Sequence, residues 1–325
     1  MGIKINWKKI SDLAARYGTF AAVVIITIGF MIFVPRFGTV SNIKTLLVQV
    51  SMLAIVSVGL TTVFAVGELD ISTGSLVSLS GIVSAYLMTI GLSSTWAILI
   101  TLFLGLMFGL TNGLIVGYLR VPALLGTFST SMIALGMNYW IGNGVSIRVA
   151  EEITGKFFIT LGSGMIFGTP IPFLIAAVII FIFFMLMEKT KWGLRMYAVG
   201  GNREAATVFG INNRLMKLIA FVLCGLTASI AGLILAARLG SGSPIAGDQY
   251  TLDAIAAVYV GVSMFREGEP HVPGTILGVL IFGILVNGMR LLGVGYEPQI
   301  ILRGIFILMA VAIAGNRAQF RVKLF

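Results

Sequence analysis

Charged residues are scarce in this chain of 325 residues: Asp, Glu, Lys and Arg together make up 10% of it, whereas hydrophobic residues make up 58%. A soluble domain of this length needs several times more charged side chains to cover its surface. The composition therefore excludes a soluble globular enzyme and predicts an all-α protein that crosses a membrane several times.

Cysteine and histidine are almost missing, since Cys224 and His271 are the single residues of their types. One cysteine within an apolar run allows neither a disulfide framework nor a Cys-ligated metal site. One histidine cannot supply a histidine zinc site, and the chain offers no order for a Ser-His-Asp triad. The loops also lack clustered acid–base groups, so we expect no catalytic, metal or cofactor site here.

Long apolar runs are what the chain does have. They predict one transmembrane domain, 1–325, with about ten spans. The expected spans are 17–34, 45–66, 71–91, 95–118, 122–142, 171–187, 215–237, 250–265, 273–291 and 297–314. The first of them follows basic residues as a signal peptide does, but it is longer and lacks a small-residue cleavage site, so we expect it to be retained.

The net charge of +10 reflects topology rather than nucleic-acid binding, because the 22 basic residues lie mainly in the tails and in short loops. Ten spans place both tails on one side of the membrane. With both tails cytoplasmic, most of the basic residues fall on the inner side, as the positive-inside rule requires. We therefore predict that both termini are cytoplasmic.

One charged segment, 188–217, interrupts the apolar runs and is expected to be a cytoplasmic loop. Asn202 can cap a short helix with Glu204 in its first turn, and Gly210 can end it. The apolar residues of this helix are Ala205, Ala206, Val208 and Phe209. Two interpretations stay open: the helix fills a groove on another protein, or it lies on the lipid surface.

Polar residues inside the predicted spans are few, and acidic residues lie near predicted span ends, so no ion-coupling chain is visible. Arg303 is the exception, since it is placed inside or near the last predicted span. Neutral groups that could hydrogen-bond a polyhydroxylated solute are Asn112, Ser129, Asn138 and Asn287. The same residue types also serve as ordinary packing contacts between membrane helices, and this alternative stays open.

Three motifs in order carry a family resemblance. They are Gly67-Glu68-Leu69-Asp70-Ile71-Ser72-Thr73-Gly74-Ser75, Gly200-Gly201-Asn202-Arg203-Glu204-Ala205-Ala206 and Leu252-Asp253-Ala254-Ile255-Ala256-Ala257-Val258. With this order and spacing, the chain resembles, from about 45 to 315, the permease subunits of bacterial ribose-type sugar ABC importers.

The resemblance implies a ten-helix permease that pairs with a second permease copy or a paralogue. It further implies an extracytoplasmic solute-binding protein that delivers a sugar-like substrate, and an ABC ATPase subunit that binds ATP. By this analogy Asn202, Arg203, Glu204, Ala205, Ala206 and Gly210 would form the coupling helix that contacts the ATPase. The chain itself has no phosphate-binding loop, because Gly155-Lys156 is followed by Phe157 and lacks the earlier glycine spacing.

Two further interpretations complete the predictions. A stand-alone secondary transporter or channel for a small polar solute is the alternative function, favoured if a buried charge such as Arg303 is a working site. The longer outer loop, 144–169, is either the contact for the delivery protein or a solvated connection.

Overall fold

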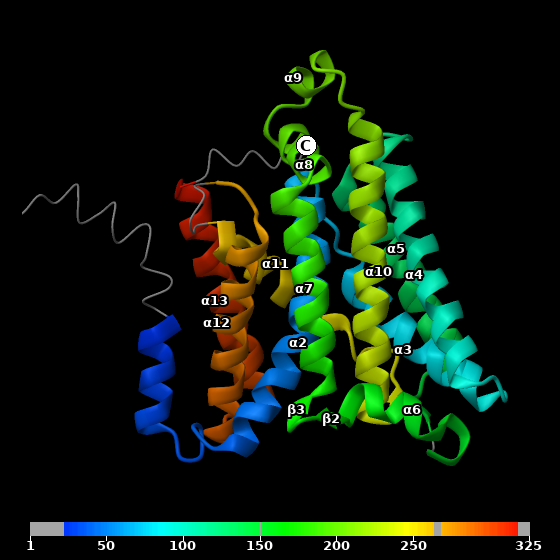
Figure 1. Ribbon diagram of the computed structural model, residues 1–325, viewed down its shortest axis with the longest axis vertical. Helices are drawn as coiled ribbons and strands as arrows, with labels where there is room; N and C mark the ends of the chain where they lie inside the picture. Colours follow the sequence, from blue (N-terminus) through cyan, green and yellow to red (C-terminus); the bar gives the residue numbers. More distant parts are fainter. Residues whose placement is uncertain (1–22, 150, 263–267, 318–325) are drawn as a thin grey trace, which may run out of the picture.

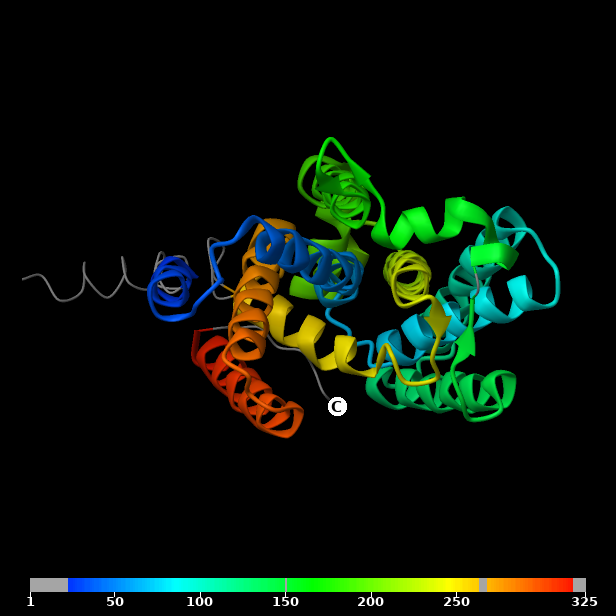
Figure 2. The same cartoon turned by 90° about the horizontal axis from the view of Figure 1, so that it is seen from below.

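The computed structural model describes residues 23–149, 151–262 and 268–317, and these form a bundle of helices with two very short strand pairs (Figures 1 and 2). The helices that coincide with the apolar runs of the sequence are Val23–Phe33, α2 (Val40–Ala65), α3 (Thr73–Thr89), α4 (Ser94–Gly117), α5 (Ala123–Gly142), α7 (Ile171–Lys189), α10 (Asn213–Leu239), α11 (Asp248–Val262), α12 (Val272–Leu291) and α13 (Tyr296–Arg317). Every span predicted from the apolar runs overlaps one of them.

The helices differ in whether they are long and apolar enough to cross a membrane. Within the described residues, five helices are long and apolar enough to cross a membrane: α2, α4, α7, α10 and α12. Val23–Phe33 and α3 are apolar but shorter. The chain is thus a multi-pass helical protein, and the figure of ten crossings stays a prediction. The start of predicted span 17–34, the end of 250–265 and both basic tails lie outside the described residues.

The two ends of the bundle differ (Figure 1). One end carries α8 (Lys191–Gly201) and α9 (Arg203–Val208), between α7 and α10. The other end carries α6 (Glu151–Ser163) and the two strand pairs. These pairs join β1 (Ile147–Arg148) to β4 (Ser241–Gly242) and β2 (Met165–Ile166) to β3 (Thr169–Pro170). The outer loop expected at 144–169 is therefore largely structured, because α6 packs against α10 with Phe158 fully buried.

Side-chain caps explain where the short helices begin. The Thr190 hydroxyl accepts from the backbone N–H groups of the first turn of α8, and the Asn202 side chain accepts from Ala205 at α9. Gly210, with φ +75°, makes the turn after α9 that L side chains resist. The predicted cap and stop of this helix are confirmed. The sequence interpretation missed α8, which precedes it.

α10 is the central helix, in contact with α2, α3 and α4. Its approach to α4 depends on glycines: a Cβ at Gly109 would overlap the carbonyl oxygen of Phe221, and one at Gly225 would overlap that of Gly105. Small residues of this kind let membrane helices pack backbone to backbone. The contact between α4 and α10 therefore depends on close backbone approach at these glycines.

We expect Gly109→Ala to destabilise the purified protein by about 1–3 kcal/mol, because the methyl group meets a helix backbone that cannot move away locally. The measurement is the midpoint of thermal unfolding in detergent. Gly136→Ala is the matched control: this glycine of α5 has no atom within 4 Å of an added Cβ, so the same gain in helix propensity comes without overlap. Equal midpoints for the two variants would contradict the prediction.

Candidate functional site

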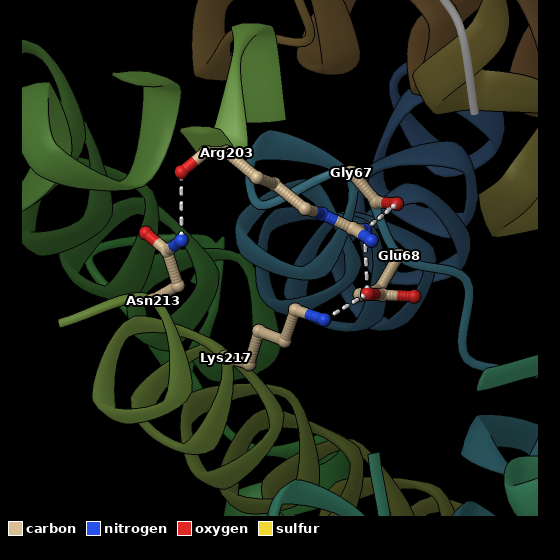
Figure 3. A network of polar contacts seen from close by, with 5 residues as sticks. All are labelled: Gly67, Glu68, Arg203, Asn213 and Lys217. Carbon is tan, nitrogen blue, oxygen red and sulfur yellow. Dashed lines mark hydrogen bonds and ion pairs between the residues drawn. The ribbon is translucent and has the colours of Figure 1, made fainter. Parts of the chain in front are cut away.

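Glu68 holds together three elements that are far apart in the sequence (Figure 3). It lies in the connector 66–72 between α2 and α3. One carboxylate oxygen, Oε1, is 2.6 Å from Nη2 of Arg203 on α9 and 2.6 Å from Nζ of Lys217 on α10. The Glu68 side chain is 10% exposed and that of Lys217 is 14% exposed, whereas Arg203 is 39% exposed. The network is therefore partly screened by water on its Arg203 side.

The backbone fixes this geometry. Gly67, with φ +74°, turns the chain after α2, and its carbonyl oxygen accepts a second bond from Arg203 Nη2 at 3.2 Å. Asn213 Nδ2 donates to the Arg203 carbonyl oxygen at 2.9 Å, from the first residue of α10. Gly200, at the end of α8, lies against the Ala65 carbonyl so closely that no Cβ would fit. The α8–α9 segment is thus bound to the end of α2 and to the start of α10.

A cavity of about 390 Å³ opens beside this network. Its charged lining consists of Glu68, Arg120, Arg203, Arg214 and Lys217, with apolar side chains from the α4–α5 turn. Four basic groups around a single carboxylate make this end of the bundle electropositive. Such a surface attracts an acidic partner surface and speeds its association.

Two residues beyond Glu68, the connector enters a buried polar network. Asp70 Oδ1 accepts from the backbone N–H and the hydroxyl of Ser72, at 2.8 and 2.6 Å. Asn112 of α4 donates to the same hydroxyl at 2.8 Å and accepts from Thr130 of α5 at 2.7 Å. Asp70 is 2% exposed and Asn112 is 1% exposed. The main chain from Glu68 to Asp70 therefore joins the ion pairs with α9 and α10 to the interior contacts of α4 and α5.

The four residues predicted to line a translocation path do not meet. Asn112 belongs to the network just described, and Asn138 donates to the Ser75 carbonyl at 3.2 Å. Asn287 of α12 and Asn42 of α2 exchange two amide hydrogen bonds of 2.9 Å. Ser129 lies on the exposed side of α5, with its hydroxyl bonded to the Leu125 carbonyl at 2.9 Å. Three of the four thus occupy separate helix contacts, which is the geometry of the packing alternative.

The residues predicted to contact an ATPase divide into two groups. Asn202, Glu204 and Gly210 are exposed, Ala205 is half-buried, and Ala206 is 3% exposed. Arg203 turns toward Glu68 rather than outward. The apolar side chains that do project from α9 and its end are Val208, 86% exposed, and Phe209, 84% exposed. The sequence interpretation missed Glu68 as the shared partner of Arg203 and Lys217. No local signal links Glu68 to Arg203, which lies 135 residues later in the chain.

Several apolar helices long enough to cross a membrane, with the short helix α9 held at one end of the bundle, define the class: a multi-pass membrane protein. Residues 42–313 match the family described as "Branched-chain amino acid transport system / permease component", and the chain belongs to this family. It is a multi-pass protein of the inner membrane.

Characterised relatives are similar over most of their length. The ribose import permease protein RbsC of Escherichia coli (strain K12) is 36% identical over 87% of this chain and 88% of its own. RbsC of Bacillus subtilis (strain 168) is 35% identical over 91% of each chain. The L-arabinose transport system permease protein AraH of Escherichia coli (strain K12) is 34% identical over 91% of this chain and 89% of its own. No solved structure matches the chain at a significant level.

Proposed function

We propose that this chain is the membrane-spanning permease subunit of an ATP-driven ABC importer for a simple sugar or a sugar-like solute. The observation that carries the proposal is its similarity, over about nine-tenths of its length, to permeases named for ribose import and for L-arabinose transport. Ten helices would then cross the membrane, with both termini and the α8–α9 segment on the cytoplasmic side. The distribution of basic residues supports that orientation.

In this proposal α9 is the coupling helix. Val208 and Phe209 project from it and would enter a groove of the ATPase, while Asn202, Glu204 and Gly210 border them. Arg203 and Ala206 act inside the permease, where they hold α9 to the bundle. ATP binds to the partner ATPase. The electropositive cavity beside Glu68 would steer acidic groups of that partner toward the same end.

The end of the bundle opposite α8 and α9 would contact a different partner from the ATPase. An extracytoplasmic solute-binding protein would dock at the end that carries α6 and the strand pairs. A second permease copy or a paralogue would complete the membrane unit. Closure of the ATPase dimer would pull the two coupling helices, and the connector 66–72 would pass the movement to α3, α4 and α5. This is alternating access, in which specificity is set mainly by the delivery protein.

We expect the double variant Val208→Ser, Phe209→Ser to lose at least tenfold of its associated ATPase, because two exposed apolar anchors are replaced by polar groups. The measurement is affinity purification of the tagged full chain from native membranes, with the ATPase recognised in the mass spectrum by its phosphate-loop peptide. Phe167→Ser is the matched control: this phenylalanine is fully exposed at the opposite end, between β2 and β3. Unchanged ATPase recovery in the double variant would exclude α9 as the coupling helix.

A second candidate is a stand-alone secondary transporter, and one observation favours it. Arg303 of α13 and Asp253 of α11 form a largely buried pair, 3.4 Å apart, and buried ionisable groups mark coupled transport in membrane bundles. Uptake of ribose or L-arabinose by proteoliposomes that contain only this chain, driven by a pH gradient, would support the secondary transporter. We expect no such uptake without the ATPase.

A further inference from the structure

A second cavity, of about 340 Å³, lies among α2, α10, α11, α12 and α13. Its polar lining consists of Gln49, Arg238, Gln249, Tyr250, Asp253, Arg290 and Arg303. None of the four residues predicted to line a path contributes to it. Such a concentration of polar groups between membrane helices is costly and typically marks a functional site.

The polar groups form an incomplete hydrogen-bond network. Arg303 Nη1 donates to Gln249 Oε1 at 2.6 Å and lies 3.4 Å from Asp253 Oδ2. Arg303 Nε and Gln49 Oε1 are both buried without a hydrogen-bond partner among the described residues. Buried polar atoms in native proteins are almost always paired, so an orphan donor and an orphan acceptor beside one cavity need a reason. A ligand rich in hydroxyl groups supplies both kinds of partner when these side chains turn toward it.

The positive charge of this cavity is partly offset. Arg303 is opposed by Asp253. Arg238 is in the last turn of α10 and Arg290 is in the last turn of α12, where the negative ends of the helix dipoles offset part of their charge. The guanidinium groups also serve as directed hydrogen-bond donors to hydroxyl oxygens.

The remaining lining is apolar and includes Met52, Leu53, Leu235 and Phe282. A sugar ring is amphipathic in the same way, with hydroxyl groups at its edge and C–H groups on its faces. The volume lies within the range of about 300–1,000 Å³ typical of small-molecule sites, in which a few polar groups orient a ligand against an apolar wall. The cavity thus has both the size and the mixed surface that a monosaccharide requires.

Its position along the bundle is also informative. Arg238 is at the far end of α10 from Asn213, which follows α9. Gln49 is in the first half of α2, whose last residue, Ala65, contacts Gly200 of α8. The cavity therefore lies in the half of the bundle away from α8 and α9. In the orientation proposed above, this half faces the solute-binding protein.

We propose that this cavity is a transient site within a single permease chain for a neutral polyhydroxylated solute entering from the extracytoplasmic side. The inference rests on the proposed function for its direction of entry. Gln49, Gln249, Asp253 and Arg303 hydrogen-bond the hydroxyl groups, and the apolar wall contacts a face of the ring. In this proposal the Asp253–Arg303 pair binds the solute and does not couple transport to an ion gradient.

The test is saturation-transfer NMR on the purified full chain in lipid nanodiscs, with ribose or L-arabinose as the probe. We expect transfer to both sugars, and at least a fivefold loss of it in Gln49→Leu and in Asp253→Asn. Thr111→Val, on the exposed side of α4, is the control and keeps the signal of the unaltered chain. Gln49→Leu introduces no charge, so it stays informative if Asp253→Asn fails to fold.

Any of three results with the sugars or the sugar phosphate would overturn the proposal: no transfer to either sugar in the unaltered chain, unchanged transfer in Gln49→Leu, or preferential transfer to ribose 5-phosphate. The last would show an anion site formed by the arginines. Equal transfer to leucine would also overturn it, since leucine offers no set of hydroxyl groups. ATPase recovery with the same chain is measured in parallel. If the ATPase is recovered but no sugar signal is seen, only the assignment of the cavity is wrong. If the sugar signal is seen but no ATPase is recovered, the proposal that the chain belongs to an ABC importer is wrong.

The direction of entry is tested by thiol labelling, because Cys224 is buried and the sequence contains no other cysteine. We expect Gln249→Cys to react from the extracytoplasmic side with a membrane-impermeant methanethiosulfonate reagent. Excess ribose or L-arabinose should slow the reaction at least threefold, whereas leucine should not. Labelling only from the cytoplasmic side, or no slowing by either sugar, would overturn the proposed entry.

Discussion

Gly200→Ala is expected to reduce sugar uptake by at least tenfold while the permease still reaches the membrane. Gly200, in the last turn of α8, lies against the carbonyl oxygen of Ala65, and a Cβ on Gly200 would overlap that oxygen. Both partners are backbone, so α8 must move away from α2. The bonds of Arg203 to Gly67 and Glu68 depend on that contact. The measurement is initial uptake of labelled ribose or L-arabinose in cells that contain the complete importer.

Gly201→Ala provides a matched control one residue away. An added Cβ at Gly201 has no atom within 4 Å, so it gains the same helix propensity without overlap. We expect uptake close to that of the unaltered chain. If both variants transported normally, the close contact between α8 and α2 would have no part in coupling.

Glu68→Gln is expected to have the second large effect, at least a tenfold loss of uptake with the ATPase still bound. The change leaves Arg203 and Lys217 facing a neutral amide instead of the carboxylate that both contact at 2.6 Å. Removing one partner of a fully buried pair costs about 3–5 kcal/mol, and the exposure of Arg203 places this site below that range. Uptake and ATPase recovery are measured on the same membranes.

The control for Glu68→Gln is Glu297→Gln, which removes an exposed carboxylate at the start of α13. We expect it to leave uptake unchanged. The double variant Glu68→Gln, Lys217→Gln removes one of the two unmatched charges, that of the more buried Lys217, and should recover part of the lost thermal stability, since groups in contact do not act additively. Additive losses in the double variant would show that the two side chains do not interact.

Local patterns predicted the elements of this fold well. The apolar runs located the helices to within a few residues, because a segment in lipid must satisfy its backbone internally and expose apolar side chains. The cap at Asn202 and the turn at Gly210 could also be predicted from the sequence, since both depend on neighbours within one helical turn. Helices α6 and α8 were missed, because each is short and less apolar than a span and owes its place to packing.

The sites were less predictable. The sequence placed Asn112, Asn138 and Asn287 inside predicted spans, but the chemistry of an amide suits a solute and a helix neighbour equally well. Only the arrangement of helices shows that each bonds a neighbouring element. Arg303 was recognised as an unusual charge, yet its partners on α11 lie about 50 residues earlier in the chain.

The sequence by itself determined the membrane class, the positions of the helices and, through three ordered motifs, the family. The first two depend on composition and on short-range periodicity, which hydropathy and helix geometry impose locally, whereas the family rests on the resemblance of the motifs. The tertiary structure alone decided which distant residues meet: Glu68 with Arg203 and Lys217, and Asp253 with Arg303 around a polar cavity. Such contacts depend on how helices pack side by side, and no local pattern encodes which faces of two distant helices come together.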